Sequence, residues 1–258
     1  MSMIASISGS QEINILNRNG RIDPYAVFQL NFDAMGGEKV VKYDNTFKFS
    51  GKMEINGFTF DIEDYKKKPS KSLRVVSSNY KIQYRTGDDG VNIWAEQDGK
   101  VTKLFDGDSP ERQINKLWDE YAYTDPKSKF FIVTANHRKV SIKGDNCYEI
   151  KIRNKKTDEV VTHYYDAESF LLKREKREGS KEKIQTDFDD YKAVGNTLMA
   201  YKLNITYTDT NIKHYITWDK IDKGLYISDS KFYPPQDDKK NDNFSALTGL
   251  GTHFSTYA

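Results

Sequence analysis

The sequence predicts a mainly β protein in which an antiparallel meander curls into a barrel or half-barrel, with helices packed against it. Aromatic residues make up 13% of the 258 residues, including 17 Tyr and 14 Phe, and many alternate with polar residues. Turn residues recur at a spacing of roughly 8 to 12 residues, and most of the runs between them are too short for a helix. Hydrophobic residues are only 37% of the chain, which favours sheets with one dry and one wet face.

A helix is expected first, beginning after Asp23 at Pro24 and ending at Gly36-Gly37. Asp caps a helix, proline is tolerated in the first turn, and glycine readily adopts the left-handed end. Apolar side chains cover a wide arc in two stripes, which are Tyr25, Phe28, Phe32 and Met35, and Val27, Leu30 and Ala34. A helix on a flat surface needs a narrower arc, so the pattern indicates a helix wedged into a concave sheet.

The clearest strand comes next, over residues 47–55, where apolar or small residues alternate with polar residues throughout. This period of two is that of a strand with one buried face. Asn56-Gly57 supplies a tight turn, and Phe58, Phe60 and Ile62 alternate with polar residues on the way back. The two runs therefore predict a β-hairpin.

Further short strands are expected along the rest of the chain. The runs are 73–75, 81–85, 91–96, 101–105, 140–142, 148–152, 160–165, 170–174, 184–191, 201–207 and 212–218. A second helix is expected over residues 110–121, where Ile114, Leu117, Trp118 and Tyr121 form one apolar stripe. We expect residues 1–22 to be an N-terminal extension, 23–236 one domain, and 237–258 a tail after Pro234-Pro235.

Composition excludes several kinds of function. The 40 Lys and Arg residues against 38 Asp and Glu leave a formal net charge of +2, so no strong field attracts nucleic acid or an anionic membrane. One cysteine, Cys147, and four scattered histidines form neither a disulfide scaffold nor a zinc module. No run reaches the roughly 18 apolar residues of a transmembrane helix. We expect a chain without a nucleic-acid partner or a transmembrane segment.

Motifs of catalysis are missing from the sequence. There is no nucleophile elbow, no phosphate-binding glycine loop and no His-Glu-x-x-His helix. The carboxylates Asp187, Asp189 and Asp190 lack the spacing of a calcium loop, and a lone His163 on a strand is more typical of a packed side chain. The sequence therefore predicts no catalytic residue, no metal site and no cofactor, and the protein is not expected to be an enzyme.

Five short segments follow one another between about residues 25 and 207. They are Ala34-Met35-Gly36-Gly37, Lys68-Pro69-Ser70, Asp89-Gly90 with Trp94 beyond it, Tyr164 to Leu172, and Phe188 to Lys192 followed by Gly195. In this order and spacing they resemble the superfamily of periplasmic lipoprotein carriers that includes LolA and LolB. The chain departs from it at Lys68, where the best-known carriers have arginine, at Leu198-Met199, where a proline is frequent, and in its C-terminal tail.

The resemblance implies a half-closed antiparallel barrel of about 10 or 11 strands, with two or more helices on the concave side, which holds acyl chains. Combined with the alternation of the strands, it predicts a set of ligand-binding side chains. They are Phe28, Phe32, Phe47, Phe49, Met53, Phe58, Phe60, Ile62, Leu73, Val75, Trp94, Leu117 and Trp118. Each of them could instead fill the barrel, since small barrels are packed solid. The many large aromatics and the wide apolar helix stripes favour a cavity.

Lys68 is added to this set as a residue at the rim of the groove. It lies just beyond the strand that carries Phe58, Phe60 and Ile62, so it could meet a polar head group or a carbonyl of a covering helix. Lysine in place of arginine replaces a planar fork with a flexible point charge. Movement of the helix over residues 110–121 would provide a gate for loading and release.

Three functions remain open at this stage. The first is a periplasmic carrier of lipoprotein acyl chains or lipid between an inner-membrane donor and an outer-membrane acceptor, with its signal peptide absent from the sequence. The second is a non-carrier envelope scaffold that contacts a protein through an edge strand or the tail. The third is a membrane-anchored receptor of the same superfamily, which needs a lipidated N-terminal cysteine.

Overall fold

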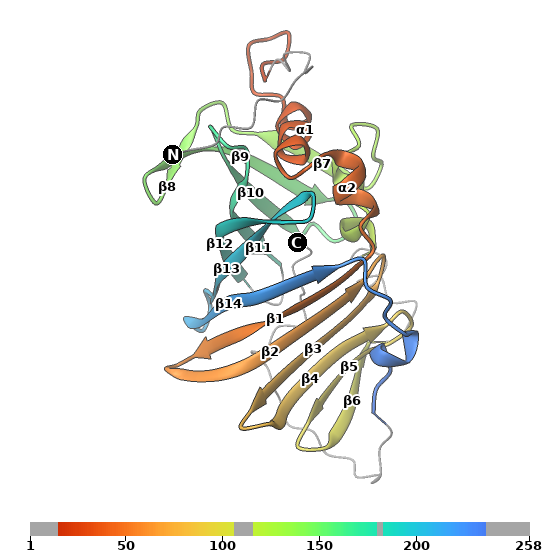
Figure 1. Ribbon diagram of the computed structural model, residues 1–258. Helices are drawn as coiled ribbons and strands as arrows, with labels where there is room; N and C mark the ends of the chain where they lie inside the picture. Colours follow the sequence, from red (N-terminus) through yellow and green to blue (C-terminus); the bar gives the residue numbers. More distant parts are fainter. Residues whose placement is uncertain (1–14, 106–115, 180–182, 236–258) are drawn as a thin grey trace.

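The fold is a single strongly curved antiparallel sheet with one long helix inside the curve, seen in a computed structural model (Figure 1). The structure describes residues 15–105, 116–179 and 183–235. Its strands are β1 (Thr46–Ile55), β2 (Phe58–Lys67), β3 (Lys71–Ser78), β4 (Lys81–Asp89), β5 (Ile93–Gln97), β6 (Lys100–Phe105), β7 (Phe131–Ala135), β8 (Val140–Ile142), β9 (Asp145–Asn154), β10 (Val160–Asp166), β11 (Leu172–Glu178), β12 (Lys183–Val194), β13 (Thr197–Tyr207) and β14 (Ile212–Lys223). Its helices are α1 (Pro24–Ala34) and α2 (Glu38–Tyr43), with the 3-10 turns η1 (Ala122–Thr124) and η2 (Asp229–Phe232).

The sheet is open at two edges. Its strand order is β6-β5-β4-β3-β2-β1-β14-β13-β12-β11-β10-β9-β7, and β8 pairs with β9 beside this path. The prediction of a mainly β, half-closed antiparallel barrel is confirmed. The 14-stranded sheet has more strands than the 10 or 11 expected, partly because β7 was not among the predicted runs.

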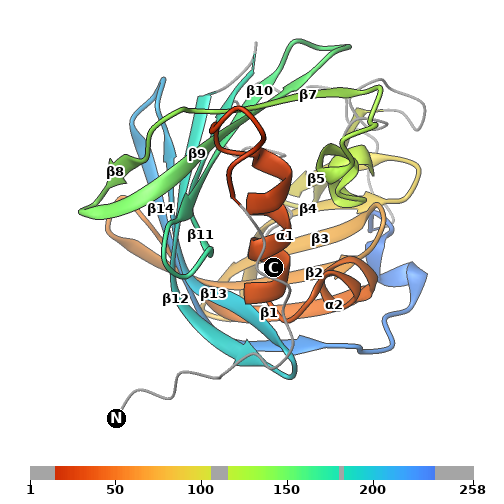
Figure 2. The same cartoon turned by 90° about the horizontal axis from the view of Figure 1, so that it is seen from above.

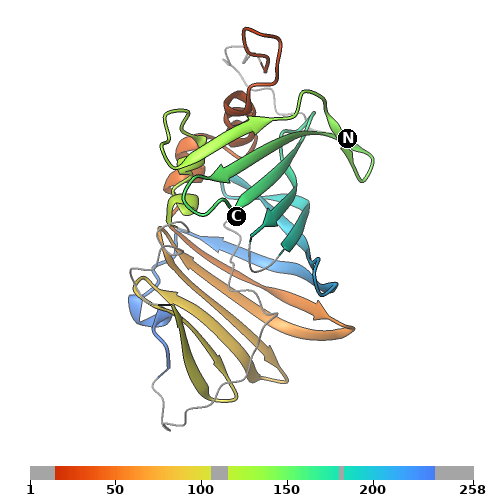
Figure 3. The ribbon, with the colours of Figure 1, turned by 180° about the vertical axis from the view of Figure 1, so that it is seen from behind.

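Pairing of β1 with β14 joins two meanders into one sheet. One meander runs from β1 to β6 and the other from β7 to β14, and Figure 3 shows them as two halves that meet along β14. The register between β1 and β14 shifts at Ser50/Gly51. A side chain at Gly51 would place its Cβ 2.2 Å from the carbonyl oxygen of Thr217, so only glycine fits this bulge.

The helix α1 lies inside the ring formed by the curved strands (Figure 2). Its predicted start is confirmed, because the Asp23 side chain accepts a hydrogen bond of 2.9 Å from the backbone N–H of Tyr25. Gly36 and Gly37 follow with φ angles of 115° and 106°. The short helix α2, which the sequence pattern did not predict, then leads into β1.

The boundaries of the chain's segments are only partly visible. Within the expected N-terminal extension, Leu16 pairs with Ile22 in an isolated antiparallel bridge. The predicted helix over residues 110–121 is helical over 116–119, and its first six residues lie outside the described part. The expected tail over 237–258 also lies outside it.

Candidate functional site

The register of the strands assigns each side chain to a face of the sheet. Met53 lies opposite Phe60, and Gly51 opposite Ile62, so the even-numbered residues of β2 face the same side as Phe47, Phe49 and Met53 of β1. Pairing with β14 adds Ile216 and Trp218 to this side. The members pack together as one apolar cluster, the concave cluster, with Phe47, Phe49, Met53, Ile62, Val76, Tyr84, Ala95, Val194, Met199, Ile216, Trp218 and Ile221 buried and Phe60 partly buried against them.

A pocket opens on this concave side near the hairpin ends of the strands. It has a volume of about 190 Å³. Met53, Ile55, Phe60 and Val76 supply its apolar lining. A cavity of about 150 Å³ holds benzene, so this pocket has room for a short length of acyl chain without any movement.

Polar side chains make up the rest of the pocket lining, and some pair directly with the apolar ones, as His214 does with Ile55. Arg74 on β3 donates two hydrogen bonds to Asp64 on β2, 2.8 Å from Nε to Oδ1 and 2.5 Å from Nη2 to Oδ2. Arg74 lines the pocket and Asp64 does not, and the other polar lining residues are Tyr84, Thr86, Tyr207 and His214, with Gln83, Gln97 and Asp98. Burial and the positive charge of Arg74 lower the pKa of His214 to about 4, so its ring is neutral at pH 7.

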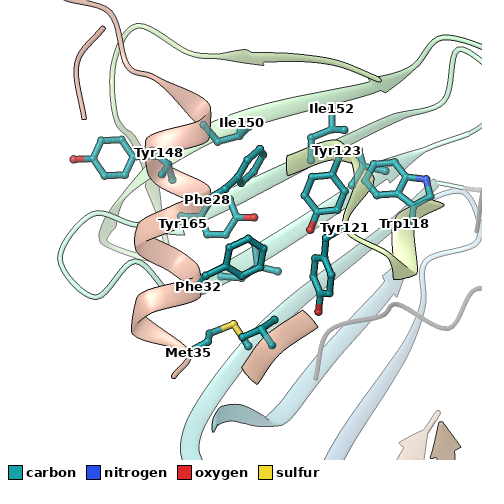
Figure 4. Close-up of a cluster of buried hydrophobic side chains, with 14 of the residues drawn as sticks. Phe28, Phe32, Met35, Trp118, Tyr121, Tyr123, Tyr148, Ile150, Ile152 and Tyr165 are labelled. Carbon is teal, nitrogen blue, oxygen red and sulfur yellow. The ribbon is translucent and has the colours of Figure 1, made fainter. Parts of the chain in front are cut away.

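The other half of the concave side is filled by the protein's own side chains. Phe28 of α1 packs edge-on against Tyr123 and Tyr165, with ring centres 5.4 and 6.0 Å apart, and Phe32 packs against Tyr121 at 5.6 Å (Figure 4). The ring centres of Trp118 and Phe131 lie 4.8 Å apart. These side chains form one buried cluster, the filled cluster, with Ile150, Ile152 and Val161 of the sheet. Phe28, Phe32 and Trp118 are therefore placed as core residues rather than around the pocket.

The expectation that Leu73, Val75 and Trp94 share the concave face is wrong. Asp64 pairs with Arg74 and Gly87 pairs with Trp94, so odd-numbered residues of β3 and Trp94 of β5 point to the convex face. There Leu73 and Trp94 form a separate cluster with Ile227 and Phe232. The Trp94 indole N–H donates to the carbonyl oxygen of Phe232 over 2.9 Å, which fixes η2 on the outside of the sheet.

Two other predicted ligand residues lie away from the pocket lining. Phe58 is 70% exposed at the start of β2. It follows the turn formed by Asn56 and Gly57, both of which have a positive φ angle. Leu117 is partly buried against the filled cluster. In the concave cluster the structure brings together five of the predicted residues, Phe47, Phe49, Met53, Phe60 and Ile62. Of these, Met53 and Phe60 line the pocket.

Lys68 lies where three elements meet. Its Nζ donates to the carbonyl oxygen of Val41 in α2 over 3.0 Å. The same amine lies 5.8 Å from the ring centre of Phe47 and 5.0 Å from that of Tyr121. Cation–π contacts of this kind hold a desolvated amine against aromatic faces. Lys68 therefore ties α2 and the segment before η1 to β1.

Replacing Lys68 by methionine tests this buried position through pH. Burial lowers the pKa of Lys68 from 10.5 to about 8, so between these values the unfolded chain holds a proton that the folded chain has released. Stability contributed by this group therefore rises with pH. Over this window we expect the wild type to gain up to about 3 kcal/mol of unfolding free energy relative to Lys68→Met. Urea unfolding at several pH values measures the difference, and a difference independent of pH contradicts the assignment.

Trp94→Ala is expected to destabilise the fold without weakening acyl-chain binding. Removing a buried Trp costs about 3–5 kcal/mol, but Trp94 faces the convex side. The matched variant Trp218→Ala removes a ring of similar burial on the concave side, and there we expect both stability and acyl affinity to fall. Thermal unfolding and titration with a fluorescent fatty acid measure the two effects. Equal loss of affinity in both variants contradicts the assignment of faces.

Sequence reasoning missed the polar part of the pocket. Asp64 lies in phase with Phe60 and Ile62 along β2, and Arg74 in phase with Val76 along β3. A charged residue at an apolar position of a strand pattern is a signal for a paired or functional group. The remaining members come from strands far apart in the sequence, so only the fold brings them together.

A second buried polar group lies in the filled half. His163 contacts the Tyr165 hydroxyl at 2.9 Å through Nδ1 and Glu175 at 3.2 Å through Nε2. Burial lowers the pKa of His163 although Glu175 opposes the shift. The nearby Arg177 lies 5.6 Å from the Trp118 ring. These contacts link β10 to β11 within the core.

Residues 15–105, 116–179 and 183–235 contain no group of three or more His, Cys, Asp or Glu side chains placed to hold a metal ion. In the same part of the chain, no helix has the length and apolar character needed to cross a bilayer.

Comparison with known proteins places the fold. No protein-family model matches the sequence, and no curated protein matches it. Among the solved structures that match are three with TM-scores of 0.55, 0.56 and 0.52. They are an outer-membrane lipoprotein-sorting protein domain from Vibrio parahaemolyticus (9% identity, 81% of this chain and 95% of that one), a DUF1329 family protein from Desulfovibrio piger (13%, 82% and 98%), and a LolA superfamily protein from Nitrosomonas europaea (8%, 80% and 97%).

The similarity covers 95%, 98% and 97% of these structures, and at identities of 9%, 13% and 8% it shows the fold and not an activity. The resemblance expected from the sequence segments is thereby confirmed at the level of architecture. The chain has a LolA-like fold.

Proposed function

We propose that this protein is a carrier, not an enzyme, that holds acyl chains of lipoproteins or lipids on the concave side of β1 to β5, β13 and β14. The observation that carries the proposal is the pocket of about 190 Å³ beside the concave cluster. The LolA-like fold supports it, since neighbours with this fold include a lipoprotein-sorting domain and a LolA superfamily protein.

The volume of the pocket limits what it holds before any movement. At the density of benzene in a cavity of about 150 Å³, it accepts about seven or eight carbons. Each buried methylene contributes about 0.8 kcal/mol, so this length contributes about 6 kcal/mol. A chain of 16 carbons, if fully buried, contributes about 12 kcal/mol. The concave side must therefore open further to hold a whole chain, and a partial fit favours exchange over permanent retention.

Opening involves the contacts made by Lys68. Its amine connects Val41 of α2, Tyr121 before η1 and Phe47 of the concave cluster. Separating these elements would uncover the inner end of the concave cluster, where Phe47 and Phe49 lie. We infer that loading and release proceed by movement of this kind, between an inner-membrane donor and an outer-membrane acceptor in the periplasm.

Detergent-free purification followed by organic extraction and mass spectrometry tests the proposal. We expect close to one acyl-bearing molecule per protein chain after export to the periplasm of a Gram-negative host. Phe60→Asp, which places a charge in the pocket, serves as the unloaded comparison. An extract with the same lipid content for wild type and Phe60→Asp contradicts the carrier.

A scaffold role is the alternative, and one observation favours it. On the convex face a groove of about 590 Å³ lies beside η2, lined by residues that include Tyr80, Ile82 and Tyr233. Tyr80 is fully exposed and Tyr233 is 54% exposed, which suits a protein contact. The same barrel could also serve a membrane-anchored receptor. Loss of partner binding in Tyr80→Ala, with lipid absent from the extract, would support the scaffold.

A further inference from the structure

Burial of acyl chains leaves the polar part of the concave pocket unexplained. An apolar chain needs only the side formed by Met53, Ile55, Phe60 and Val76. The rest of the lining presents hydroxyl, guanidinium and imidazole groups from β3, β4, β13 and β14, and these are Arg74, Tyr84, Thr86, Tyr207 and His214. Small-molecule sites typically combine such an apolar body with a few converging polar groups that fix orientation.

His214 is the member of this polar side whose bonding is incomplete. It pairs with Ile55 of β1 and Ile205 of β13 in the middle of the sheet. Its side chain is 3% exposed, and its ring lies 5.0 Å from that of Tyr207. Within the described part of the chain, its Nε2 has no hydrogen-bond partner. Buried polar atoms nearly always have one, so this nitrogen points to a ligand group.

Charges on the polar side compensate one another. The Arg74 guanidinium is held by both oxygens of Asp64. Asp98 lies exposed at the edge of the pocket. The amine of Lys66, one position further along this face of β2, lies 5.7 Å from the Phe49 ring and outside the pocket lining. Asp64 is not itself among the lining residues, but it balances the charge of Arg74, so this pair offers neither an anion nor a cation an unbalanced countercharge.

We propose that the pocket binds the hydroxyl-bearing end of an uncharged amphipathic molecule, a long-chain alcohol or a monoacylglycerol, with His214 Nε2 as its hydrogen-bond partner. A neutral imidazole presents either an N–H or a lone pair at Nε2, and a hydroxyl both donates and accepts. One hydroxyl therefore satisfies either tautomer. The inference rests on the proposed function in that it names the ligand class for the same pocket.

Three probes, each built on a chain of eight carbons, separate the head groups. They are 1-octanol, octanoate and octyltrimethylammonium, titrated into the full chain at pH 7.5 by calorimetry. We expect 1-octanol to bind at least about tenfold more tightly than either charged probe, because the charged head groups lose hydration without gaining a free countercharge. Octanoate or octyltrimethylammonium binding as tightly as 1-octanol overturns the proposal.

A pair of histidine variants assigns the hydrogen bond. His214→Leu keeps a side chain of similar volume and removes the Nε2 atom. We expect it to weaken the binding of 1-octanol by about tenfold, which corresponds to about 1.4 kcal/mol. His137→Leu, at an exposed position outside the pocket, serves as the matched control and should leave affinity unchanged. Equal affinities in the two variants overturn the proposal.

Nitrogen-15 NMR of histidine-labelled wild-type protein gives a second readout that does not depend on a variant folding. We expect 1-octanol to shift the Nε2 resonance of His214 and to leave that of His137 in place. An unmoved His214 resonance at saturating 1-octanol overturns the assignment. If lipid co-purifies but 1-octanol has no preference, only this inference fails. If 1-octanol binds at His214 but no lipid is carried, the carrier fails and the site stands.

Discussion

Phe60→Asp is expected to lower the affinity for a fluorescent fatty acid by at least about tenfold. Phe60 lies opposite Met53 on the concave face and lines the pocket, where its ring is only partly buried. A carboxylate at this position would have to lose its hydration when an acyl chain enters the pocket. The aspartate side chain is too short to place its carboxylate in solvent outside the pocket. Because Phe60 is near the hairpin end of β2, we expect the fold to tolerate the change.

Thr59→Asp is the matched control for this prediction. Thr59 is the neighbouring residue of the same strand, but it is exposed and points away from the pocket. The variant adds the same charge to the same hairpin, so we expect an unchanged fatty-acid affinity. Titration followed by fluorescence measures both variants, and circular dichroism confirms that both are folded. A similar loss in Thr59→Asp contradicts a specific role of the concave face.

Phe28→Ala is expected to lower the free energy of unfolding by about 3–5 kcal/mol. Its ring is 3% exposed and contacts Tyr123 and Tyr165 inside the filled cluster. Removing it leaves a cavity that the surrounding strands cannot close, since protein interiors are close-packed. Acyl-chain affinity should stay within about twofold of wild type at a temperature where the variant is folded, because α1 does not line the pocket.

Phe58→Ala is the comparison for the stability change. This phenylalanine is 70% exposed at the tip of the first hairpin, and surface substitutions usually change stability by about 0.5 kcal/mol or less. Urea unfolding of the two variants measures the contrast. A small destabilisation in Phe28→Ala together with weakened fatty-acid binding would mean that α1 lines the ligand site after all.

The alternation of apolar and polar residues made the hairpin of β1 and β2 predictable. In β3 the sequence pattern did not show which set of alternate residues lies on the concave face. In β1 only one set of alternate residues is apolar, so the buried side follows from the pattern. In β3 both sets contain apolar residues, with Leu73 and Val75 on one side and Val76 on the other. The turn between β2 and β3 sets which residues of β3 face the concave side. It pairs Lys67 with Lys71, and this register keeps the even-numbered residues of both strands on one face.

The same limit explains why the predicted apolar ligand residues divide among the concave cluster, the filled cluster, the convex face and, for Phe58, the exposed tip of the first hairpin. Large aromatic side chains indicate burial but not what covers them. The wide apolar arc of α1 correctly predicted a helix inside a concave sheet, and the structure shows that its side chains complete the core there. The pocket lies where strands far apart in sequence converge, which depends on the pairing of β1 with β14 and not on any local pattern.

The division of the concave side into a filled half and a ligand-binding half can be tested most directly by NMR. Met35 belongs to the filled cluster and Met53 to the concave cluster. In deuterated protein with labelled methionine methyl groups, we expect nuclear Overhauser effects from bound hexadecanoate to the methyl group of Met53 and none to that of Met35. Contacts to Met35, or bound hexadecanoate without contacts to Met53, would contradict the proposed site.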